Sequence, residues 1–132
     1  MKLFKVMKDG GPKSHVTGFF LVEIKSLFSI ALLRFDHGTR EAFHSHAFNA
    51  VTLWLSGVVR EHLYAGGSRE WTPGQLKYTA RGCFHKVETL TKASWALSFR
   101  GPWNPTWKEY LPEENKFVTL THGRKIVNEV TA

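Results

Sequence analysis

Two histidines, His44 and His46, stand one residue apart in the segment that carries the clearest chemical signal of the chain. In a β-strand, residues i and i+2 point to the same face, so the two imidazoles would lie about 7 Å apart along the strand. Imidazoles on one face can share a metal ion, with bonds of roughly 2.0–2.1 Å for zinc, if a neighbouring strand supplies a third ligand. The alternative is that both histidines are surface or packing residues without a ligand.

Glycines frame this His-Ser-His segment at regular distances. Five residues lie between Gly38 and His44, three separate His46 from Ala50, and six more precede Gly57. This spacing resembles the first sequence motif of the cupin superfamily, in which a glutamate ligand stands at the position of Ala50.

A second glycine-framed histidine follows further along the chain. Gly74 leads through five residues to Ala80-Arg81-Gly82, two residues then precede His85, and three more separate it from Thr89. This arrangement resembles the second cupin motif, with Ala80 in place of a proline and Thr89 in place of an asparagine.

The resemblance implies an all-β fold, a cupin-type double-stranded β-helix or jelly-roll barrel, with an internal metal site formed by His44, His46 and His85. Ala50 cannot coordinate an ion, and the remaining set is similar to the three-histidine site of cysteine dioxygenase and related thiol dioxygenases, which hold ferrous iron. Fe(II) is therefore the expected cofactor, although imidazoles alone do not select iron over zinc, nickel, manganese or copper. The alternative is a cupin barrel that has lost its metal. Against it, inward imidazoles without an ion would be poorly paired polar groups.

Further candidates for the site lie on the strand expected over residues 58–64. Arg60, His62 and Tyr64 share one face of that strand, and a cavity-facing orientation would make them candidate catalytic residues for an anionic or hydroxylated ligand. The alternative for the same three residues is a solvated outer face. Cys83 lies two residues before His85 and could supply a thiolate ligand. No residue is assigned to an organic cofactor.

Short segments rich in Val, Phe, Trp, Thr and Tyr, separated by Gly, Pro, Asn and Asp, predict strands along most of the chain. Only residues 1–10 and 112–116 could hold a short helical turn, and the Pro-rich segment 101–107 is expected to be a loop. Residues 1–132 are interpreted as a single cupin domain, with its motifs at 38–57 and 74–89. The expected strands are 17–24, 27–35, 50–55, 58–64, 76–79, 85–90, 94–100, 117–121 and 125–130.

Composition narrows the classes of protein and partner. The 132 residues, 42% hydrophobic and 22% charged, fit one soluble globular domain. The net charge of +7 suits an anionic ligand, but the basic residues are spread along the chain, so nucleic-acid binding is not expected. The longest apolar stretches fall far short of a membrane span of roughly 20 residues, and the N-terminal segment has no apolar signal core. With its single cysteine the chain is expected to be cytoplasmic, and edge strands at its termini would allow a homodimer.

These features favour a metal-dependent enzyme of dioxygenase type, a non-haem Fe(II) oxidoreductase, that acts on a small anionic molecule. Open coordination positions beside three neutral imidazoles suit such chemistry. Two alternatives remain. One is a binding module that holds a small ligand without turnover. The other is a sugar-nucleotide isomerase or epimerase, which would need a histidine base and a tyrosine or aspartate acid.

Overall fold

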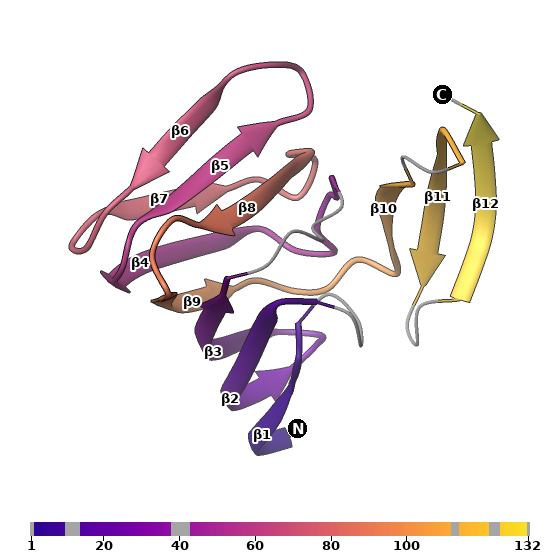
Figure 1. Ribbon diagram of the computed structural model, residues 1–132. Coiled ribbons are helices and arrows are strands. Elements are labelled where there is room, and N and C mark those ends of the chain that lie inside the picture. Colours follow the sequence, from indigo (N-terminus) through magenta and orange to yellow (C-terminus); the bar gives the residue numbers. More distant parts are fainter. Residues whose placement is uncertain (1, 10–13, 38–42, 112–113, 122–124, 132) are drawn as a thin grey trace.

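The computed structural model describes residues 2–9, 14–37, 43–111, 114–121 and 125–131. Within these ranges every regular element is a β-strand, which confirms the expected all-β class (Figure 1). The strands are β1 (Lys2–Lys8), β2 (Val16–Ile24), β3 (Phe28–Asp36), β4 (Ala50–Ser56), β5 (Val59–Leu63), β6 (Ser68–Trp71), β7 (Leu76–Thr79), β8 (His85–Thr89), β9 (Ala93–Arg100), β10 (Thr106–Leu111), β11 (Lys116–Thr121) and β12 (Lys125–Thr131).

The strands form two layers with jelly-roll connections. One layer is a six-stranded sheet in the order β1-β2-β3-β9-β4-β7. The three-stranded sheet β6-β5-β8 faces it, and the three-stranded sheet β10-β11-β12 lies to one side of the barrel, on the right in Figure 1. Strands that are distant in sequence are therefore neighbours in space, as where β9 runs between β3 and β4.

The segment that carries the first two histidines joins the two three-stranded sheets. His44 forms antiparallel bridges with His85 at the start of β8 and with Glu109 in β10. The backbone N–H of His44 donates to the carbonyl of His85 at 2.9 Å, and that of Tyr110 donates to the carbonyl of Phe43 at 2.8 Å. Because this short stretch lies between β8 and β10, His44 is held directly beside His85.

The main core fills the space between the two layers of the barrel. Strand β3 shows how alternation produces it, because Ala31, Leu33 and Phe35 are buried while the residues between them are more exposed. The interior also holds buried polar side chains, among them Glu61 and Lys77. The apolar core consists of Val16, Phe20, Ala31, Leu33, Phe35, Trp54, Val59 and Ala96, with Trp71 and Val87 packed against it.

Nine of the twelve strands in the described ranges lie within a residue or two of the expected bounds, and three were not expected. Residues 2–8 form β1 instead of a helical turn, because pairing with β2 outweighs a local pattern interrupted by lysines. The loop expected to run to residue 107 ends at Pro105, after which β10 pairs with β11. The short strand β6 pairs with β5. The other expected helical turn falls partly outside the described residues, and its described part is a turn at 114–115 followed by β11.

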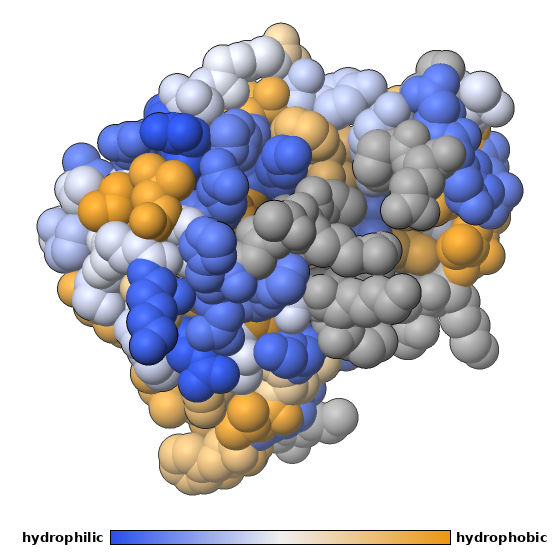
Figure 2. Space-filling model, in the orientation of Figure 1, coloured by the Kyte–Doolittle hydropathy of each residue, from blue (hydrophilic) through white to orange (hydrophobic). Residues whose placement is uncertain are grey.

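Apolar side chains are exposed at the N-terminal edge of the six-stranded sheet. Leu3, Phe4 and Val6 of β1 are 53%, 80% and 61% exposed, and Leu27 beyond β2 is 61% exposed. Figure 2 shows this apolar surface at the lower end of the molecule, where β1 and β2 lie in Figure 1. Among the described residues no helix is long and apolar enough to cross a membrane.

Candidate metal centre

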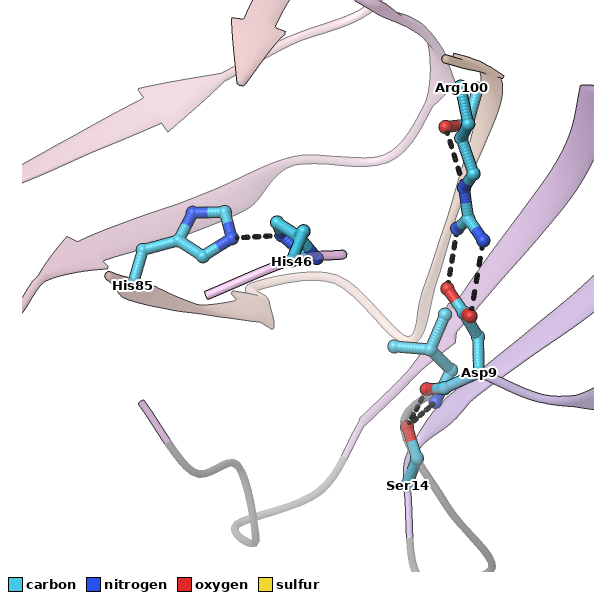
Figure 3. A network of polar contacts seen from close by, with 7 residues as sticks. Asp9, Ser14, His46, His85 and Arg100 are labelled. Atoms are coloured by element: carbon cyan, nitrogen blue, oxygen red, sulfur yellow. Dashed lines mark hydrogen bonds and ion pairs between the residues drawn. The ribbon is translucent and has the colours of Figure 1, made fainter. Parts of the chain in front are cut away.

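The structure brings His44, His46 and His85 together. One ring nitrogen from each lies within 4.8 Å of the others, and the Nε2 atoms of His46 and His85 are 2.8 Å apart (Figure 3). The bridge between His44 and β8 places the first ring, and the backbone N–H of His46 donates to the carbonyl of Arg81 at 3.2 Å, which fixes the segment beside the turn before β8. Two glycine-framed motifs thus converge on one point.

Glu61 on β5 determines which nitrogen of His85 faces the cluster. Its Oε2 lies 2.5 Å from Nδ1 of His85, and its side chain is 1% exposed. Burial alone would raise the pKa of Glu61, but the hydrogen bonds from His85 and Lys77 outweigh it and lower the pKa to about 2. The carboxylate is therefore ionised and can only accept, so Nδ1 of His85 carries the hydrogen and its Nε2 presents a lone pair to the cluster.

His46 and His85 are neutral at physiological pH. Burial, with a smaller contribution from the neighbouring rings, lowers the pKa of His46 well below its usual value. Burial also lowers the pKa of His85 to about 4, although the hydrogen bond to Glu61 acts in the opposite direction. Neutral imidazoles are the form that binds metals.

The spacing of the rings fits a shared ion. Two nitrogens bound to one ion at roughly 2.0–2.1 Å lie about 3 Å apart. The Nε2 atoms of His46 and His85 are at hydrogen-bonding distance, 2.8 Å, so a small separation of the rings would accommodate an ion between them. A carboxylate that holds the far nitrogen of a ligating histidine is a common feature of metal sites, because it fixes the tautomer and the ring orientation. Glu61 holds His85 in this way, so the residues present fit a metal ion.

Lys77 on β7 balances the charge of Glu61 inside the barrel. Its Nζ lies 2.6 Å from Oε2 of Glu61, and its side chain is 7% exposed. Burial lowers the pKa of Lys77, and the carboxylate partly restores it. Trp71 adds a hydrogen bond from Nε1 to Oε1 of Glu61 at 3.3 Å. The carboxylate is thus held by three side chains from three strands.

Ala50 occupies the position of the cupin glutamate and is packed rather than open. It is 7% exposed and belongs to a small apolar cluster with Ala47 and Phe48, covered by Trp103 and Trp107. The Phe48 ring is stacked on the His46 ring, with centroids 5.4 Å apart. The position at which the cupin motif has its glutamate is therefore surrounded by apolar side chains.

The candidate residues of the 58–64 strand do not join the histidines. Glu61 faces inward with Val59, so the alternating set turns outward. Arg60 pairs with the exposed Glu70 at 2.8 Å, and Nε2 of His62 lies 2.8 Å from Oε1 of Glu88. Tyr64 is 44% exposed and packs edge-on against neighbouring aromatic rings. Of the two orientations considered for these residues, the structure has the outward one.

Cys83 lies close to the centre but on the side of Glu61. Its Sγ, a Glu61 oxygen and a His85 nitrogen lie within 4.8 Å of one another, which makes a second donor group that shares His85. Burial and the charge of Glu61 both raise the pKa of the Cys83 thiol. A thiol in this environment stays protonated at neutral pH, so the possibility of a thiolate ligand at Cys83 gains no support.

The glycines that frame the two motifs are required for different structural reasons. Gly57 has φ +78, and a Cβ at this position would lie 2.7 Å from the carbonyl oxygen of Ala93, so the tight turn between β4 and β5 requires glycine. Gly74 has φ +90, but a Cβ there would meet no atom within 4 Å, so the backbone angle alone favours glycine at this position. Gly38 lies outside the described residues.

Sequence reasoning missed the inward charged residues. Glu61 and Lys77 were not among the candidates; the sequence signal for Glu61 is that it shares the face of Val59 and Leu63, opposite to Arg60 and His62. Neither residue belongs to a glycine-framed motif. Their role depends on contacts across β5, β7 and β8, which spacing along the chain does not reveal.

No protein-family model matches the sequence, and comparison with curated proteins gives no match. Among solved structures, a cupin-superfamily sugar phosphate isomerase from Silicibacter pomeroyi is similar to this chain, with a TM-score of 0.66 and 14% identity over 99% of this chain and 92% of that one. KdgF from Halomonas sp. has a TM-score of 0.58 and 16% identity, covering 76% of this chain and 94% of that one. A putative ethanolamine utilization protein from Salmonella typhimurium has a TM-score of 0.61 and 17% identity, covering 75% and 80%.

These similarities agree with the two-layered strand arrangement. They confirm the resemblance that the glycine-framed motifs indicated, at the level of the fold. The chain has the double-stranded β-helix fold of the cupin superfamily.

Proposed function

We propose that this protein is a metal-dependent enzyme that acts on a small anionic molecule. One observation carries the proposal: three ring nitrogens from two separate motifs lie within 4.8 Å of one another, and Glu61 turns the lone pair of His85 toward the others. His44, His46 and His85 would hold a divalent first-row metal. The chemistry supplied by an ion held there would be polarisation of a bound substrate or, for a redox-active metal, its reaction with dioxygen.

Fe(II) is the metal we propose first, with Zn, Ni, Mn and Cu as alternatives. Imidazole suits several of these ions, so the ligand set alone does not decide between them. Three neutral imidazoles leave the charge of a divalent ion uncompensated by its direct ligands. This favours an anionic substrate, and the net charge of +7 acts in the same direction.

The chain's own residues prepare the site in three ways. Glu61 holds the ring of His85 in one orientation. Phe48 stacks on His46 and limits its rotation. Trp103 and Trp107 pack over the apolar cluster at Ala50 and exclude water from that side.

For the reaction itself, we propose first an oxidation of dioxygenase type. The support is the set of three histidines without a carboxylate, which is similar to that of the thiol dioxygenases. The second candidate is the isomerisation of a sugar phosphate, because a similar solved structure, whose match covers 99% of this chain, is a sugar phosphate isomerase. A module that binds a small ligand without turnover is the third.

Metal analysis tests the proposal. Protein purified without a histidine tag is expected to carry close to one equivalent of metal, and His44→Ala is expected to lose it. His62→Ala is the matched control, because His62 lies at the surface against Glu88, and it should retain the metal. A protein that holds no metal and takes up none when offered Fe(II), Mn(II), Ni(II) or Zn(II) would contradict the proposal.

Activity assays then separate the reactions. Oxygen consumption with small thiols supports the dioxygenase, and interconversion of sugar phosphates without oxygen uptake supports the isomerase. A metal-loaded protein with neither activity would favour the binding module. Cys83 is a free cysteine, and we propose a reducing, cytoplasmic location for the protein.

A further inference from the structure

The end of β9 carries a buried arginine whose charge is balanced by a partly exposed carboxylate. The Arg100 side chain is 4% exposed, and its Nε donates to Oγ of Ser98 at 3.2 Å. Its Nη1 and Nη2 donate to Oδ1 and Oδ2 of Asp9 at 3.3 and 2.6 Å, in the two-pronged arrangement drawn in Figure 3. Asp9 follows β1, so the counter-charge comes from the N-terminal hairpin.

This ion pair lies beside the histidine cluster. Arg100 is the register partner of Ala50, the position at which the cupin motif has its glutamate. The guanidinium carbon lies 4.6 Å from the centroid of the Phe48 ring, and that ring is stacked on His46. The charge of Arg100 contributes to lowering the pKa of His46, which places the guanidinium within electrostatic reach of the cluster.

Arg100 and Lys77 are both cations buried near the histidine cluster, but their charges are balanced differently. Lys77 is neutralised within the barrel, by Glu61 of β5. Arg100 receives its carboxylate from Asp9, whose side chain is 28% exposed and therefore reaches the solvent. The two guanidinium N–H groups of Arg100 thus form a fork that packs against an aromatic ring and faces a solvent-accessible carboxylate. This is the form of an oxyanion-binding site.

We propose that Arg100 binds the anionic group of the substrate and that the Asp9 carboxylate occupies this place on Arg100 when no substrate is bound. The ligand group is a planar or tetrahedral oxyanion, a carboxylate or a phosphoryl group, that accepts two N–H bonds from the guanidinium. This inference rests on the proposed function for the identity of the ligand as substrate, but the anion site is testable without metal.

The exchange requires only the Asp9 side chain to move. The backbone of Asp9 is fixed by its N–H, which donates to the carbonyl of Val16 at 2.9 Å, and by its carbonyl, which accepts from Oγ of Ser14 at 2.6 Å. Rotation about the side-chain bonds moves the carboxylate toward solvent and frees the fork. An incoming anion competes with Asp9, so its apparent affinity is lower than the affinity of the free fork.

The test measures the binding of inorganic phosphate and of acetate to the whole, chelator-treated protein by NMR titration at constant ionic strength. Asp9→Asn removes the competing charge and is expected to tighten binding by about tenfold or more. Asp36→Asn is the matched control, because it makes the same charge change in an exposed pair with Arg34 and should leave the affinity unchanged. Arg100→Gln should abolish the binding.

Each outcome supports or overturns the anion site. Equal affinities in Asp9→Asn and Asp36→Asn would show that the pair only fastens the hairpin, and the proposal falls. If Arg100→Gln does not fold, Arg100→Lys serves instead, since it keeps the charge but loses the fork and should still weaken binding. Tighter binding of phosphate than of acetate assigns a phosphoryl ligand, and the reverse assigns a carboxylate. Because metal is absent throughout, a failed metal centre leaves this result unaffected.

Discussion

Replacing Glu61 by glutamine tests how the barrel supports its candidate metal ligand. The substitution keeps the size of the side chain but removes the charge that faces His85 and Lys77, at 2.5 and 2.6 Å. Lys77 then remains buried without its counter-charge, and the amide of glutamine, which can either accept from His85 or donate to it, no longer fixes the tautomer of His85. We therefore expect a loss of both stability and metal affinity.

The pKa of Glu61 gives the size of the stability loss. It falls from a usual value of 4.5 to about 2 in the folded protein, and at 1.36 kcal/mol per unit this corresponds to about 3 kcal/mol. The contribution is fully present above pH 4.5 and is lost as the pH falls through 2. Removal of one partner from a buried ion pair costs about 3–5 kcal/mol in other proteins, which agrees. Loss of a carboxylate behind a ligating histidine lowers metal affinity by about 10–100-fold.

Urea unfolding of the metal-free protein at pH 7 measures the first effect, and titration with Fe(II) or Zn(II) measures the second. Glu70→Gln is the control, because Glu70 is 52% exposed in its pair with Arg60 and should cost less than about 1 kcal/mol. The double variant with Lys77→Met should recover most of the loss, since it removes both charges. Equal stabilities of Glu61→Gln and Glu70→Gln, or an unchanged metal affinity in Glu61→Gln, would refute this role of Glu61.

Three further predictions concern pH, the β4–β5 turn and assembly. The pKa of His85 falls from 6.5 to about 4 on folding. The free energy of unfolding of the metal-free protein should therefore decrease by about 3 kcal/mol as the pH drops through that interval. Urea unfolding that shows no such pH dependence would contradict this. Gly57→Ala should cost about 1–3 kcal/mol more than Gly67→Ala, since both have positive φ but only the former meets nearby atoms; equal melting temperatures would argue otherwise. We propose that the protein forms a homodimer through the edge strand β1. Val6 is 61% exposed on this strand, so Val6→Lys should give a monomer in light scattering. A wild-type protein that is itself monomeric would exclude the dimer.

Much of the fold is predictable because its signals are local. Alternating apolar residues and glycine-containing turns indicate the strand ranges without knowledge of their partners, and strand β7 has the bounds that the sequence predicts. Strands β1 and β10 lack such a signal, because their stability depends on pairing with β2 and β11. Local composition cannot report a partner that lies elsewhere in the chain.

The candidate site likewise contains residues that the sequence predicts and residues that it does not. His44, His46 and His85 stand in glycine-framed segments, so their convergence could be inferred from spacing and resemblance. The groups that surround them could not, because Glu61 and Arg100 act through contacts across strands. The outward orientation of Arg60 and His62 follows from the inward orientation of Glu61, since neighbours on a strand face opposite sides.

On the proposed function, the charges around the centre leave the substrate to take over the charge of the missing glutamate ligand. Glu61 places a carboxylate behind His85, but Lys77 cancels its charge. This pair therefore does not neutralise any of the charge of a bound ion. Asp9 and Arg100 cancel in the same way on the other side. On the proposed function, the two positive charges of the ion are then left for the substrate to neutralise. An anion that displaces Asp9 from Arg100 would meet one further positive charge, and this gain favours a multiply charged substrate over a singly charged one.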